Sequence, residues 1–205
     1  MRKVIFGIMG LTLAAGSAQA AGIGARIGTT GLGADVAWDL APTLSARIGY
    51  SGGSVNHDVS TDLTTYHGKL NLKNLNTFLD FAPLGPFFRF TGGFIFNDNK
   101  FDVHTDQASG GSSISGTVTP SKSAAPYLGI GYGRVAGTGV NFYADLGVMY
   151  QGSPKAALTA NCGTLSAAQC APLQSQVATQ QAQLEDKLKN AKYYPVLNIG
   201  LTIGF

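Results

Sequence analysis

The feature that most constrains this chain is a strict alternation of apolar residues with small or polar ones, which is clearest at its end. In residues 193–205, the apolar members at every second position are Leu197, Ile199, Leu201, Ile203 and Phe205. The positions between them hold Asn198, Gly200, Thr202 and Gly204. A period of two places successive side chains on opposite faces of a β-strand. The run therefore predicts a strand with one apolar face and one polar face.

The same alternation predicts seven earlier strands. We expect them at about 22–30, 32–40, 43–53, 65–82, from 87 to about 96, 124–135 and 140–152. The connections after the second, fourth and sixth of these are tight. Those after the third, fifth and seventh are long, at about 54–64, 97–123 and 153–192. An even number of strands with short turns at one end and long loops at the other is typical of a bacterial transmembrane barrel.

The fourth predicted strand contains an irregularity in its polar residues. Lys69 and Lys73 share one parity, whereas Asn74, Asn76 and Asp80 take the other. A one-residue β-bulge near Lys73 and Asn74 would reconcile the two halves and keep the strand's leucines on one outward face.

The composition favours lipid contact over a soluble fold. Charged residues make up 12% of the chain, aromatic residues 10%, and there are 28 glycines, whereas soluble domains carry about 25% charge. The segments after the N-terminus contain no apolar run long enough for a spanning helix. We therefore predict an all-β fold, an eight-stranded antiparallel up-and-down transmembrane β-barrel with one short helix in the last extracellular loop. The alternative is a soluble β-sandwich, in which the charged face would meet solvent rather than a lumen.

The N-terminus has the order of a secretory signal peptide. Arg2 and Lys3 form a short positive region, residues 4–16 are apolar, and an Ala-Gln-Ala motif ends at Ala20. The apolar run falls short of the roughly 20 residues of a membrane-spanning helix. We expect cleavage of residues 1–20, export across the inner membrane, and a mature barrel domain that begins at Ala21. Loss of Arg2 and Lys3 lowers the formal net charge of +3, and nothing in the pattern indicates a nucleic-acid partner.

If the apolar face meets lipid, eight charged residues of the strands face the lumen. These predicted lumen charges are Arg26, Asp35, Arg47, Lys69, Lys73, Asp80, Arg89 and Asp145. Opposite charges in a confined lumen must pair, because an unpaired buried charge is very costly. An eight-stranded barrel is only just wide enough for side chains to fill. We expect a charge-paired polar plug, with a narrow conduit as the alternative.

Aromatic residues lie at both ends of the predicted strands, where amphipathic rings anchor a barrel at the membrane interfaces. Trp38, Phe81 and Phe205 fall at one end, and Tyr50, Tyr150 and Tyr193 at the other.

The long segment 153–192 differs in character from the other loops. Leucines and a valine at helical spacing predict a helix at about 171–190, starting beside Pro172. The helix would cap the barrel mouth or project from it, packing on the protein's own loops or on a partner. In an exported chain, Cys162 and Cys170 are expected to form a disulfide.

The residue pattern offers little support for catalysis, a metal or a cofactor, and we expect none of these. The loop 97–123 contains Asp98, Asp102, His104 and Asp106. Their spacing is not that of a calcium-binding loop, so a solvated loop is the simpler explanation. A hydrolase needs a serine, a histidine and an acid together, and the sequence offers only His67 with Ser45 or Ser51.

Four stretches of the predicted strands are distinctive, namely GIGARIG (22–28), APYLGIGYG (125–133), DLGVMYQGSP (145–154) and YPVLNIGLTIGF (194–205). With these stretches the chain resembles the small outer-membrane barrels related to the transmembrane domain of outer-membrane protein A and to outer-membrane protein W. The resemblance implies a Gram-negative outer-membrane location among lipid and lipopolysaccharide. It also implies that the last strand with Phe205 is the signal read by the barrel-assembly machinery.

Three functions follow as hypotheses. The first is a structural or surface-interaction barrel of the cell envelope, with the long loops as a binding surface for an extracellular ligand. The second is a narrow, porin-like channel for small or apolar solutes. The third and weakest is a lipid-modifying enzyme.

Overall fold

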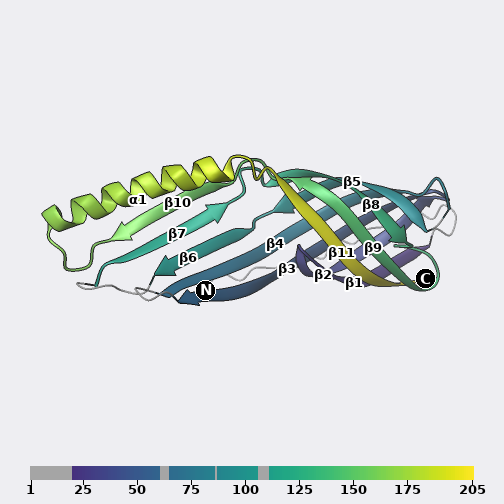
Figure 1. The fold of residues 1–205 in the computed structure, drawn as a ribbon. Helices are drawn as coiled ribbons and strands as arrows, with labels where there is room; N and C mark the ends of the chain where they lie inside the picture. The colour runs from purple at the N-terminus through teal and green to yellow at the C-terminus, as the bar shows by residue number, and fades with distance from the viewer. Residues whose placement is uncertain (1–19, 61–64, 86, 106–110) are drawn as a thin grey trace, which may run out of the picture.

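The computed structural model describes residues 20–60, 65–85, 87–105 and 111–205, and its centre is a closed antiparallel β-barrel (Figure 1). Eight strands follow one another around the ring in the order β4, β3, β2, β1, β11, β9, β8 and β5, and β5 pairs with β4 to close it. Their bounds are β1 (Ala21–Gly28), β2 (Gly31–Ala41), β3 (Leu44–Ser60), β4 (Thr65–Phe81), β5 (Phe88–Asn97), β8 (Ala124–Gly133), β9 (Gly139–Tyr150) and β11 (Tyr193–Gly204). The predicted eight-stranded barrel is confirmed. Residues 1–19, which hold most of the predicted signal peptide, lie outside the described residues.

The first and last strands of the ring pair with each other. Ile23 lies opposite Ile203 in the β1–β11 register. Beyond the ladder, Ala21 N donates to Phe205 O at 3.1 Å, and Phe205 N donates to Ala21 O at 2.9 Å. This pairing removes the edges that an open sheet would leave for aggregation. We call the end of the barrel where Ala21 and Phe205 lie the terminal end.

At the opposite end, β3 and β4 continue beyond the ring as a flat extension (Figure 1). Three further strands add to β4 in the order β6 (Lys100–Thr105), β7 (Ser113–Thr119) and β10 (Lys155–Asn161). We call β6, β7, β10 and the distal parts of β3 and β4 (54–60 and 65–71), together with the helix α1, the blade. The prediction of loops at 54–64, 97–123 and 153–192 was therefore wrong in part, because some described residues of each segment belong to β-strands. The last two segments contain the blade's three added strands.

The helix α1 (Ala167–Leu188) starts earlier than predicted. Ser166 precedes its first turn, and the Ser166 backbone N–H donates to Gln169 Oε1 at 3.1 Å, as in a capping box. Pro172 consequently lies inside the helix rather than at its start. Cys162 and Cys170 form a disulfide that joins the end of β10 to the first turn of α1. Among the described residues, no helix is long and apolar enough to span a membrane.

The predicted bulge in β4 is absent. The register of β4 on β3 runs without a shift from Thr65 opposite Ser60 to Phe81 opposite Leu44. Leu72, which the bulge would have turned outward, is buried, and Lys73 is exposed. The polar residues change parity at this point because the strand passes from the barrel into the blade, while its register on β3 continues without a shift.

The two sides of the sheet exchange character between barrel and blade. Around the ring the outward side is apolar and exposed, for example Leu128 at 73% and Phe142 at 68%. On the blade the same side is polar, and one cross-strand row consists of Asn56, Lys69, Asp102, Thr117 and Ala157. The side that continues the lumen is apolar on the blade, where one row consists of Val55, Leu70, Phe101, Val118 and Ala156.

Candidate functional site

A closed cycle of ion pairs occupies the middle of the lumen. Arg47 from β3 lies 2.7 Å from Asp145 of β9 (Nη1 to Oδ2) and 3.3 Å from Asp80 of β4 (Nε to Oδ2). Arg89 from β5 lies 3.1 Å from Asp80 (Nε to Oδ1), and its Nη2 also donates to Asp145. All four side chains are almost completely buried. Each charge thus has two opposite partners, which offsets the large desolvation cost of burying it.

A second buried pair extends this network along the lumen. Arg26 Nη1 lies 3.1 Å from Asp35 Oδ1, and Arg26 Nη2 donates to Ser51 Oγ at 3.2 Å. The hydroxyl of Tyr143 donates to Asp35, while the Arg47 guanidinium lies 4.9 Å from the centre of the same ring. Tyr143 therefore joins the two groups of charges.

Six of the eight predicted lumen charges belong to this network, and two do not. Lys69 and Lys73 are exposed on the outward side of β4. Their placement in the lumen was wrong because it depended on the bulge. The buried charges that remain are three arginines and three aspartates, namely Arg26, Arg47, Arg89, Asp35, Asp80 and Asp145.

Inward glycines make the space that the large lumen side chains occupy. A Cβ added to Gly200 would lie 2.2 Å from Cζ of Tyr143, and one added to Gly147 would lie 2.5 Å from the Tyr127 hydroxyl. Distances this short are steric clashes. Gly147 and Gly200 therefore leave room for the two tyrosine side chains and do not line an open pore.

Apolar groups fill the lumen on either side of the charges. Toward the blade lies a buried cluster of Phe78, Ile95, Ala125, Tyr127, Met149 and Val196. At the terminal end, the segment 134–138 turns inward, and Val135 and Ala136 are buried against Ala37 and Tyr143. The alternation predicts a strand that ends at Val135 and a tight connection up to residue 139, so the inward turn was not predicted. The signal that could have found it is the apolar pair Val135 and Ala136 where the strand meets this connection, because exposed polar residues are usual there.

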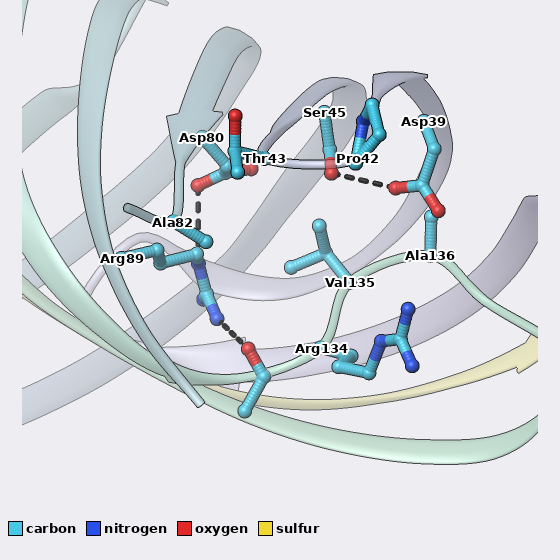
Figure 2. A pocket seen from close by; sticks show the side chains of 11 residues that line it. Asp39, Pro42, Thr43, Ser45, Asp80, Ala82, Arg89, Arg134, Val135 and Ala136 are labelled. Carbon is cyan, nitrogen blue, oxygen red and sulfur yellow. Dashed lines mark hydrogen bonds and ion pairs between the residues drawn. The ribbon is translucent and has the colours of Figure 1, made fainter. Parts of the chain in front are cut away.

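A small cavity lies beside this inward segment (Figure 2). Its volume is about 40 Å³, and Asp39, Asp80, Arg89 and Arg134 contribute its charged lining. Figure 2 shows Arg89 pointing toward Asp80, and the Arg89 guanidinium also donates to the Gly133 carbonyl. A water molecule needs roughly 10–15 Å³ of such space. The cavity can thus hold a few water molecules but not a solute.

On the blade, α1 lies along the free edge of β10. The backbone N–H of Leu158 donates to Gln181 Oε1 at 3.0 Å, and that of Ala156 donates to Glu185 Oε1 at 3.3 Å. Residues four apart on a helix rise about 6 Å, close to the roughly 6.7 Å between alternate residues of a strand. This match lets two side chains of α1 satisfy edge groups that would otherwise lack a strand partner, with Val177 buried beside them.

The weakly indicated catalytic and metal groups do not converge on a site. His67 lies in the blade, with its Nδ1 3.0 Å from Asp58 Oδ1 and its ring stacked on His104. Ser51 is in the lumen opposite Asn74, which is seven residues and so about 23 Å from His67 along β4. Asp102 accepts hydrogen bonds from Asn71 and Thr117. In the described part of the chain, no three His, Cys, Asp or Glu side chains could hold a metal ion, and Asp106 lies outside it.

The aromatic residues predicted as girdles face outward at the two ends of the barrel. Tyr150 and Tyr193 are cross-strand neighbours at the blade end with ring centres 5.4 Å apart, and Tyr50 is exposed on the outward side. Phe81 and Phe205 are exposed at the terminal end.

Comparison with solved structures finds proteins of similar fold, among them two from one organism. One is CarO2 of Acinetobacter baumannii, with a TM-score of 0.65 and 23% identity over 92% of this chain and 100% of that one. The other is CarO of the same organism, with a TM-score of 0.61 and 22% identity over 90% of this chain and 97% of that one. No protein-family model matches the chain, and neither does any curated protein sequence.

Proposed function

We propose that this chain is an integral outer-membrane protein whose filled barrel anchors the blade outside the membrane as a surface for interaction. The observation that carries the proposal is the reversal of the outward side at Lys73. Between Lys73 and the terminal end, the outward side of the ring is a band of exposed apolar groups, as on the lipid face of a transmembrane barrel. From Lys73 into the blade the same side is polar, as contact with water requires.

The aromatic residues at the two ends support the same placement. Tyr50, Tyr150 and Tyr193 would lie at one lipid–water interface, and Phe81 and Phe205 at the other. Both chain ends and the tight turns would then face the periplasm, and the blade the exterior, with lipopolysaccharide around its base. The solved structures of similar fold, both Acinetobacter CarO proteins, and the sequence resemblance to small outer-membrane barrels are consistent with this location.

Cysteine labelling of intact cells tests the placement, because both native cysteines are held in a disulfide. We expect a membrane-impermeant maleimide to label Ser115→Cys on the blade. Thr138→Cys at the terminal end should react only after the outer membrane is permeabilised. Ile199→Cys lies in the band of exposed apolar groups around the ring, which we call the apolar belt. It should react only when the protein is unfolded without detergent, because lipid or detergent covers it when the barrel is folded.

The opposite pattern would contradict the proposal. Labelling of Thr138→Cys but not Ser115→Cys in intact cells would invert the topology, and labelling of folded Ile199→Cys in membranes would remove the barrel from lipid. Wild-type protein, which has no free thiol, measures background labelling.

The filled lumen favours an anchor over the second hypothesis, a narrow channel. Three layers of side chains occupy it: the apolar cluster around Phe78, the charge network around Arg47, and the inward pair Val135 and Ala136. We expect no stable single-channel conductance in planar bilayers. A stable conductance that responds to substitution of Arg26 or Arg47 would support the channel instead.

We also propose that the role requires no catalysis. Mass spectrometry of lipid A from cells with and without the gene checks this. Unchanged lipid A is the expected result, and a difference restored by the wild-type gene but not by a His67→Ala variant would favour an enzyme.

A further inference from the structure

A second cavity lies at the foot of the blade's apolar side, where the blade leaves the barrel. Its volume is about 140 Å³. Leu70 and Leu72 of β4, Phe101 of β6 and Val118 of β7 form one wall, and Tyr194 of β11 faces them from the far side of the ring. The cavity therefore occupies the mouth of the barrel, directly above the plugged lumen.

Four of the polar side chains at its border already have partners. Asn99 Oδ1 accepts from Lys73 N at 2.9 Å, Gln151 Nε2 donates to Ala191 O at 3.1 Å, and Tyr194 donates to Thr29 O at 2.8 Å. Lys100 Nζ lies 3.7 Å from the carboxylate of Asp98. A charged ligand would have to compete with these contacts, whereas an uncharged apolar ligand requires none of them to change.

The apolar side around the cavity remains partly exposed. Phe101 is 40% exposed and Val55, in the same cross-strand row, is 58% exposed. In the proposed placement this row lies outside the membrane in water. Clustered apolar groups on a water-facing surface are typical of binding sites.

From these observations we infer that the cavity binds a small uncharged apolar compound, of about the size of one aromatic ring. The size follows from the volume, because an apolar cavity of roughly 150 Å³ in another protein binds benzene. The inference deepens the proposed surface role and rests on it, since it requires that the cavity opens outside the lipid.

Methyl-resolved NMR of the full chain in lipid nanodiscs tests the inference, with toluene as the probe. We expect saturable shifts of the Leu70, Leu72 and Val118 methyl groups. The methyl groups of Leu128, on the apolar belt, should shift linearly with concentration, as partition into lipid requires. Benzoate, of similar size but charged, should leave the cavity methyl groups unshifted.

A matched pair of variants separates the cavity from the rest of the row. Val118→Phe fills the cavity and should abolish saturation at Leu70 and Leu72. Val55→Phe makes the same change in the same row but outside the cavity lining, and should leave the titration unchanged. Heat-modifiable gel migration verifies that each variant is folded.

The wild-type titration decides the question even if Val118→Phe does not fold. Linear shifts at Leu70 and Leu72, or equal binding of benzoate, would overturn the inference. A blade that faces the periplasm instead of the exterior gives a different result: toluene would still saturate the cavity, but Ser115→Cys would not be labelled on intact cells.

Discussion

Arg47 and Asp145 form a buried ion pair that crosses the lumen, with 2.7 Å between Nη1 and Oδ2. Their strands, β3 and β9, are diametrically opposed in the ring, because three strands separate them on either side. The pair therefore connects walls of the barrel that share no backbone hydrogen bonds. The middle of the barrel is held together by ion pairs, with buried apolar clusters on either side of them.

Removing one member of this network should destabilise the barrel strongly. Asp145→Ala leaves Arg47 and Arg89 each without one of its carboxylate partners, and we expect a loss of about 3–5 kcal/mol in the free energy of unfolding. Urea unfolding in lipid vesicles measures it. Asp186→Ala is the control, because its pair with Lys189 on α1 is exposed and contributes about 1 kcal/mol or less. Equal stability of the two variants would contradict the central role of the network.

A methyl group added inside the barrel should act differently from one added outside. In Gly200→Ala the new Cβ meets the Tyr143 ring, and overpacking of this kind costs about 1–3 kcal/mol. In Gly92→Ala the Cβ points outward and meets only the Leu128 side chain, at 4.0 Å, so stability should not fall. Equilibrium unfolding of the two variants compares the same change in two neighbourhoods. A Gly200→Ala barrel as stable as Gly92→Ala would mean that Tyr143 moves aside freely.

The edge of β10 should depend on two side chains of α1. In the double variant Gln181→Leu and Glu185→Leu, the amides of Ala156 and Leu158 lose their acceptors and should exchange faster with deuterium. Exchange measured by NMR resolves the two amides from those paired to β7. Gln180→Leu, on the exposed side of the same helix, should leave exchange unchanged. Unaltered protection in the double variant would show that burial alone shields the edge.

Deletion of Phe205 should reduce the amount of assembled protein at the cell surface. The residue extends the β1–β11 closure through its backbone, and its ring is exposed at the terminal end. Surface labelling of Ser115→Cys combined with heat-modifiable migration reports assembly. Phe87→Ala removes another exposed aromatic ring at the same end and should assemble normally. Normal surface levels without Phe205 would refute its role as an assembly signal.

The barrel was predictable because its strands are long and have different media on their two sides. The blade strands were not, although Phe101 and Val103 in β6, and Ile114 and Val118 in β7, also alternate. These strands have six or seven residues and form only against the edge that β4 offers. That edge is a property of the assembled sheet and leaves no mark within the segments themselves.

The misplaced lysines have a related physical cause. Alternation reports which medium each side of a strand meets, and a change of medium along one strand looks the same as a change of register. At Lys69 and Lys73 the medium changes and the register does not. The predicted bulge wrongly interpreted this change of medium as a change of register. The charges of the central network were predictable because all of them lie in the barrel, between the change of medium at Lys73 and the terminal end. The inward turn at Val135 and Ala136 was not, because its burial depends on the space left by Ala37 and Tyr143.

The strands β3 and β4 pass from the barrel into the blade without a break in their pairing. The connection is therefore a continuous hydrogen-bonded pair of strands and not a flexible linker. In the proposed placement, a molecule bound to the blade would be held at a height and an angle above the membrane that the barrel sets. A force applied to the blade would reach the barrel through the β3–β4 ladder.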